Sequence, residues 1–180
     1  MGNAHPYNPK PGRHLARALS YLSPMTREQQ RAQVIQACIQ HQQHIALTAK
    51  QEMDSAQQQS NDYGANVDRY DAYRTKLMRA RDMYAKQYSN AQTSVRYLTD
   101  LLRLPPFQVA EHGAIVVTDK QRFFLSVGAG KFFVGQPGTD QAQIYFAISA
   151  QTPIYLALKG KEVGDSFIFN GIAQTIKDIF

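Results

Sequence analysis

Apolar residues recur with a helical period in residues 26–104 and with a strand-like period after residue 106. In the first part they step alternately by three and four positions, which places them along one face of each of two helices. Thr26 is a suitable N-cap for the first predicted helix, which runs to about Gln59, and the second runs from about Val67 to Leu102. The two seams are interrupted by polar positions such as Gln42 and Glu52. Their apolar positions are Ile35, Cys38, Ile45, Ala49 and Ala56, then Tyr73, Leu77, Ala80, Tyr84, Ala91, Leu98 and Leu101.

Helix-breaking residues are almost absent from this part of the chain. No proline occurs between Pro24 and Pro105, and Gly64 is the only glycine between Gly12 and Gly113. Two helices of similar length joined near a single glycine predict an antiparallel coiled-coil hairpin with its tip at residues 59–66. At 1.5 Å per residue, arms of about 35 residues reach about 50 Å.

Beyond Pro105 and Pro106 the pattern predicts strands at residues 114–117, 123–127, 131–134, 143–149, 167–169 and 172–179. Thr152 and Pro153 begin a short helix that runs to about Lys159. We expect a small antiparallel sheet with one helix on it, so the fold class is α+β. All nine phenylalanines lie in this part. Those predicted to fill its core are Phe123, Phe124, Phe132, Phe133, Phe146, Phe167 and Phe169.

The chain therefore divides into a flexible basic arm (residues 1–25), a hairpin (26–104) and a sheet domain (105–180). The net charge of +6 is uneven. The arm has three basic and no acidic residues, the hairpin eleven basic and eight acidic, and the sheet domain six of each. A mild basic excess on the arm and the hairpin favours a polyanionic or acidic partner.

Several classes of protein and of site are disfavoured by the sequence. No apolar run is long enough for a membrane span, and the N-terminus has no secretory apolar region. The single cysteine, Cys38, excludes an internal disulfide and a cysteine zinc site and favours a reducing, cytoplasmic setting. His41 and His44 are more typical of a solvated helix face than of a metal site. The segment 128–131 lacks the spacing of a phosphate-binding loop.

The segment from residue 148 to residue 165 carries an ordered series of short motifs. They are Ile148-Ser149, Thr152-Pro153, Ala157-Leu158, Gly160-Lys161 and Gly164-Asp165. This order resembles the C-terminal signature of the Gre transcript-cleavage factors of bacteria. The resemblance implies an FKBP-like fold for residues 105–180 and a coiled-coil hairpin before it. It also implies structural roles for Ser149, Pro153, Gly160, Gly164 and Asp165.

The same resemblance implies a function in transcription elongation. Gre factors insert the hairpin into the secondary channel of bacterial RNA polymerase, where acidic tip residues help to hold the second catalytic Mg²⁺. The polymerase then hydrolyses the 3′ end of backtracked RNA. On this reading the protein is a monomeric accessory factor with no catalytic residue of its own and no cofactor bound alone. Its partners would be the polymerase and the nascent RNA 3′ end, without a membrane.

The tip matches the Gre pattern only in part. The family places an aspartate three residues before a glutamate that is followed by asparagine. Here Asp62 and Asn66 match, whereas Ala65 stands at the glutamate position and Asp68 is the nearest carboxylate beyond it. Asp62, Asn66 and Asp68 are therefore the candidates to assist Mg²⁺, and Asp62 is the candidate ligand in the complex. The alternative for Asp62 is a turn residue or a helix cap.

Basic residues follow the tip on the second helix. Arg74, Lys76, Arg79 and Arg81 are the candidates for contact with polymerase or RNA, and the alternative is an ordinary solvated face with ion pairs. Three other functions stay open. They are a channel-binding factor that inhibits or competes without stimulating cleavage, an FKBP-like prolyl isomerase, and a coiled-coil scaffold with another partner.

Overall fold

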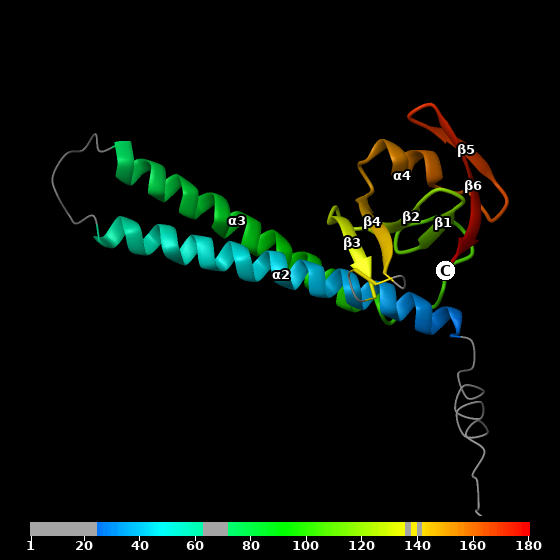
Figure 1. Ribbon diagram of the computed structural model, residues 1–180, viewed down its shortest axis with the longest axis horizontal. Helices are drawn as coiled ribbons and strands as arrows, with labels where there is room; N and C mark the ends of the chain where they lie inside the picture. The colour runs from blue at the N-terminus through cyan, green and yellow to red at the C-terminus, as the bar shows by residue number, and fades with distance from the viewer. Residues whose placement is uncertain (1–24, 63–71, 136–137, 140–141) are drawn as a thin grey trace, which may run out of the picture.

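The computed structural model describes residues 25–62, 72–135, 138–139 and 142–180, so nearly all of the arm and the centre of the tip lie outside the described residues. Two long antiparallel helices, α2 (Arg27–Asp62) and α3 (Ala72–Leu101), project from a six-stranded sheet (Figure 1). These bounds confirm the two predicted helices. No helix in the described ranges is both long and apolar enough to cross a membrane.

The sheet has the strand order β3-β4-β2-β1-β6-β5, with α4 (Pro153–Leu158) following β4. The strands are β1 (Ile115–Thr118), β2 (Arg122–Ser126), β3 (Gly130–Val134), β4 (Gln143–Ser149), β5 (Ser166–Phe169) and β6 (Ile172–Ile179). The structure is thus α+β, as predicted, but the prediction of a purely antiparallel sheet is wrong. Strands β2 and β4 are parallel, because β3 pairs with the far edge of β4 instead of lying between them.

The two faces of the sheet bury different partners. Along β2, Phe123 and Leu125 point toward α4, whereas Phe124 points toward the hairpin, as the alternation of a strand requires. Phe133 was predicted to be in the core but is 43% exposed, because its neighbour Phe132 takes the buried side of β3. On the hairpin side one cluster contains residues of both helices and of the sheet. Its buried members are Val34, Ile35, Cys38, Leu98, Leu101, Ile115, Phe124, Phe132, Val134, Tyr145, Ala147 and Phe180.

The helix–helix seam changes in character along the hairpin. Near the sheet it buries large side chains such as Ile35 and Leu98, whereas the distal half of α2 buries Ala49, Ala56 and Ser60. Fully burying a large apolar side chain contributes about 1.5–3 kcal/mol, so the distal seam is held much more weakly than the base. Most of the predicted seam is buried or half-buried, but Glu52 on α2 is exposed. The prediction that Tyr73 packs in the seam is wrong, because its side chain is 48% exposed near the end of the hairpin, where the seam is thin.

The thiol of Cys38 is part of this basal core. The side chain is fully buried between the hairpin and the sheet. Burial raises the pKa of the Cys38 thiol to about 12, because an apolar environment disfavours the thiolate. The cysteine therefore packs as a small apolar side chain.

A buried arginine joins the hairpin to the sheet at the same level. Arg31 is only 2% exposed, and its Nη1 donates to the carbonyl oxygen of Gly113 at 2.6 Å. Longer bonds run to the carbonyl oxygens of Phe180 and Leu101, and the guanidinium carbon lies 4.9 Å from the ring centroid of Phe107. Burial lowers the pKa of Arg31, against a smaller opposing effect of Tyr97. Carbonyl oxygens from three separate segments thus solvate one cation.

Replacing Arg31 by alanine should destabilise the whole protein. Arg31→Ala removes the bonds to three carbonyl groups and leaves a cavity, and we expect a loss of about 2–4 kcal/mol in the free energy of unfolding. Arg27→Ala is the matched control, because the Arg27 side chain is 61% exposed and pairs with Asp178 at the surface. The control should cost less than about 1 kcal/mol. Urea unfolding followed by circular dichroism measures both, and equal losses would contradict the role given to Arg31.

Candidate functional site

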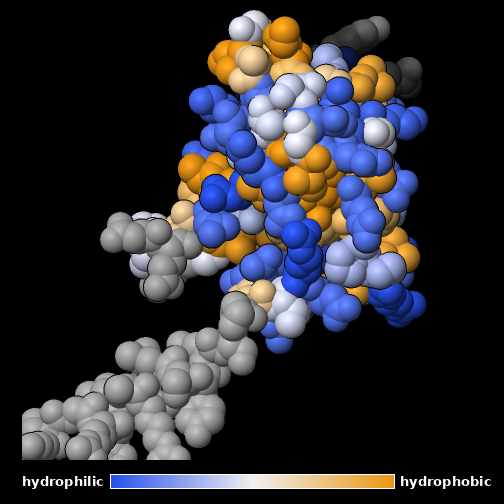
Figure 2. Space-filling model, turned by 90° about the vertical axis from the view of Figure 1, so that its right-hand side faces the viewer, coloured by the Kyte–Doolittle hydropathy of each residue, from blue (hydrophilic) through white to orange (hydrophobic). Residues whose placement is uncertain are grey.

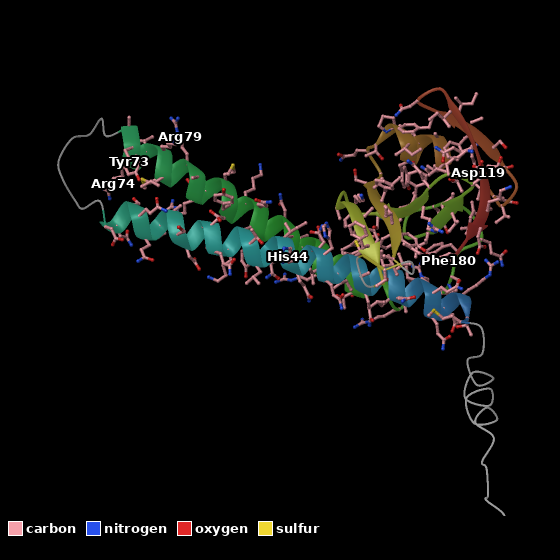
Figure 3. The ribbon with its side chains drawn as sticks, in the orientation of Figure 1. His44, Tyr73, Arg74, Arg79, Asp119 and Phe180 are labelled. Carbon is pink, nitrogen blue, oxygen red and sulfur yellow. The ribbon has the colours of Figure 1, made fainter. Side chains whose placement is uncertain are left out.

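The distal half of α3 carries a strong excess of basic residues. Between residues 72 and 86 it contains five basic side chains and one acidic side chain. Figure 3 shows that Arg74 and Arg79 lie at the end of the hairpin remote from the sheet, and Arg79 points away from α2. Lys76 and Arg79 are both exposed. Because the side chains of Lys76 and Arg79 are exposed to solvent, their charges are available to a partner.

Arg81 has a different environment from Lys76 and Arg79. Its Nη1 donates to Oε1 of Gln57 on α2 at 2.9 Å, and its Nε and Nη2 donate to Oδ1 of Asp82. The half-buried Arg81 side chain therefore bridges the two helices. Nothing in the helical pattern singles out Gln57, since it is one of several glutamines on α2. The hydrogen bond from Arg81 to Gln57 connects α3 to α2, so Arg81 helps to hold the two helices together.

Asp62 is the last residue of α2 and is exposed. The first described residue of α3 is Ala72, so residues 63–71, which decide whether Asp62 lies close to the start of the second helix, are outside the described residues. Ala65, Asn66 and Asp68, the other predicted tip positions, lie outside the described residues. The structure therefore places one candidate carboxylate at the distal end of the hairpin.

The distal half of α2 has the opposite charge balance to that of α3. Between residues 50 and 62 it has one basic and three acidic residues. Lys50 Nζ donates to Asp54 Oδ2 at 2.7 Å, and this hydrogen bond raises the pKa of Lys50. Glu52 and Asp62 are exposed on the same helix. The hairpin thus presents a basic helix beside a mildly acidic one.

The motif residues of the sheet domain lie at turns. Pro153 occupies the first turn of α4, and the Ser149 carbonyl accepts bonds from the backbone and the hydroxyl of Thr152. Thr152 therefore does not cap α4 with its side chain. Gly160 and Gly164 have φ angles of 78° and 98°, which favour glycine. Asp165 Oδ2 accepts from the Glu162 amide at 2.9 Å and closes the turn before β5. These positions shape the chain between β4 and β5.

The two histidines of α2 and the glycine-containing segment 128–131 both have structural surroundings. The His41 ring lies 6.4 Å from the ring of Phe132, and His44 is exposed on α2. Within the described ranges no group of three metal-ligating side chains comes together. The segment 128–131 leads into β3, where Lys131 Nζ lies 5.1 Å from the ring centroid of Phe133.

Comparison with protein-family models and with curated proteins found no match for this chain.

The two halves of the hairpin should respond differently to the loss of a leucine. Leu77→Ala weakens the thin distal seam, and we expect amide hydrogen exchange near the end of the hairpin to accelerate about tenfold or more while the sheet keeps its protection. Leu98→Ala opens a cavity in the basal core, and it should lower global stability by about 2–5 kcal/mol. Hydrogen-exchange mass spectrometry separates the two responses. A global loss from Leu77→Ala as large as that from Leu98→Ala would contradict this division.

Proposed function

We propose that this protein is a Gre-like transcription elongation regulator that inserts its helical hairpin into the secondary channel of bacterial RNA polymerase. The observation that carries the proposal is the hairpin itself, which projects from the sheet domain with Asp62 exposed at its distal end (Figure 1). The motif order from Ile148 to Asp165 adds an independent sequence argument for the same family.

The dimensions of the hairpin suit a probe of a deep channel. Helices of 36 and 30 residues span about 54 and 45 Å at 1.5 Å per residue. The base is fixed by the shared core and by Arg31, so the hairpin can carry its distal end to a defined position. A carboxylate can be positioned near a metal ion only if the element that carries it is held in a fixed orientation.

The charges on α3 support contact with an anionic surface. Lys76 and Arg79 are exposed near the distal end, where a phosphate backbone or acidic channel wall would meet them. In this proposal the polymerase holds both Mg²⁺ ions and performs the hydrolysis, and Asp62 adds one carboxylate beside the second ion. With Ala65 at the usual glutamate position, we infer that the protein binds the channel and stimulates cleavage weakly.

We assign the sheet domain to the FKBP-like class as part of the same proposal. Its short helix α4 follows β4 and packs on one sheet face. The prolyl isomerase alternative has less support, because buried side chains including Phe123, Ile154 and Leu158 fill the space between α4 and the sheet. In the proposed complex this domain docks at the rim of the channel.

Bacterial core RNA polymerase should retain the protein in a pull-down at low salt. The double variant Lys76→Glu with Arg79→Glu should weaken retention about tenfold, because it reverses two charges at the proposed contact. Arg96→Glu with Arg103→Glu is the matched control near the base of the hairpin, where Arg96 lies on α3 and Arg103 follows its end, and it should weaken retention less. Absence of binding by the wild type at low salt would refute the proposal.

Restoring the missing carboxylate should increase RNA cleavage. With stalled, backtracked elongation complexes, Ala65→Glu should speed shortening of the RNA about tenfold, which corresponds to about 1.4 kcal/mol in the barrier. Asp62→Ala should abolish the residual stimulation. Ala72→Glu adds the same charge at the first residue of α3 and should have little effect. If Ala65→Glu leaves the rate unchanged, the carboxylate argument fails even if channel binding holds.

A further inference from the structure

A cavity lies where the first turns of α2 cross the sheet. Its volume is about 420 Å³, within the range of small-molecule sites. Gln30, Gln33 and Val34 of α2 form one wall, and side chains of the sheet form the other. The cavity is remote from the distal end of the hairpin, where Asp62, Lys76 and Arg79 lie.

An arginine without an anionic partner lines this cavity. Arg122 on β2 is half-buried, and its guanidinium carbon lies 5.9 Å from the ring centroid of Tyr145. Within the described part of the chain, no carboxylate forms an ion pair with it. Asp178 also lines the cavity, but it is engaged by Arg27 at 2.7 Å and by the Ile179 amide. A half-buried cation with its charge uncompensated favours an external anion.

Several neutral hydrogen-bonding side chains line the same cavity as Arg122. The Tyr145 hydroxyl donates to Gln143 Oε1 at 3.2 Å, which leaves the amide NH₂ of Gln143 to donate elsewhere. Burial raises the pKa of Tyr145, so this hydroxyl stays protonated at neutral pH. The side-chain amides of Gln30 and Gln33 line the opposite wall. Donors from both α2 and the sheet therefore border one cavity.

The remaining lining is apolar. Val34, Val117 and Val134 come from α2, β1 and β3, and Val34 and Val134 are buried. A ligand that fills the cavity would therefore bury an apolar body and keep one charged end at Arg122.

We propose that this cavity is a binding site for a small amphipathic organic anion, with its carboxylate at Arg122 and its apolar body against Val34, Val117 and Val134. Because its walls belong to α2 and to the sheet, the ligand joins the base of the hairpin to the sheet domain. The proposal does not depend on polymerase binding. Its test uses the free protein, so its failure would leave the proposed function intact.

The test is a titration of the full-length, ¹⁵N- and methyl-labelled protein with 3-phenylpropanoate and with its neutral amide, 3-phenylpropanamide, followed by NMR. The carboxylate should shift the side-chain signals of Gln30, Gln33 and Gln143 and the methyl signals of the three valines, with a Kd of about 1–10 mM, as expected for a fragment of this size. The amide has the same shape without the charge, and it should bind at least about fivefold more weakly.

Arg122→Gln should weaken binding of the carboxylate about tenfold and leave binding of the amide unchanged. Arg96→Gln, the same change at an exposed site on α3, should alter neither. Three results would each overturn the proposal: shifts confined to other residues, equal affinity for the carboxylate and the amide, or wild-type affinity in Arg122→Gln. If Arg122→Gln does not fold, the comparison of the two probes on the wild type decides the question.

Discussion

The fold depends on the burial of one sheet face against the base of the hairpin. Ile35, Cys38 and Leu98 pack there against Phe124 and its neighbours, and Arg31 binds backbone carbonyls of both parts. Because the distal seam buries mostly small side chains, the hairpin cannot gain much stability from its own interior. The same contact therefore stabilises the long helices and fixes the direction in which they project.

Because the base of the hairpin is held much more strongly than its distal half, the molecule has two kinds of surface. The distal half of the hairpin has exposed charges, with basic α3 beside the mildly acidic end of α2, and few of those side chains are needed for folding. On the sheet domain, exposed Ile168 and Ile172 lie on the edge strand β5 and on its neighbour β6. Figure 2 shows apolar surface gathered at that end of the sheet. Substitutions of exposed charged residues on the distal hairpin can therefore change its contacts with a partner without destabilising the core.

The junction is not filled completely. The cavity that Arg122 borders lies between the first turns of α2 and the sheet. Arg31 is buried and Arg122 is half-buried. Both terminal nitrogens of Arg31 donate to backbone carbonyl oxygens, although its Nε has no hydrogen-bond partner among the described residues. Arg31 has these partners because Leu101, Gly113 and Phe180, from three separate segments, place their carbonyl groups beside its guanidinium. Arg122 lies near the ring of Tyr145 and forms no ion pair with a carboxylate of the described residues.

The sequence by itself determined the elements, since periods of 3.6 and 2 place α2, the end of α3 and the strands within a few residues of their bounds. The predicted start of the second helix, at about Val67, lies outside the described residues. It also identified the basic run on α3 and Asp62 near the end of the hairpin. Only the tertiary structure decided that β2 and β4 are parallel, that Phe133 is exposed, and that Arg81 bonds to Gln57. The tertiary structure also distinguished buried Arg31 and half-buried Arg122 from the exposed arginines. The physical reason is that a period reports which face of an element is apolar, whereas pairing and burial of a charge depend on segments distant in the chain.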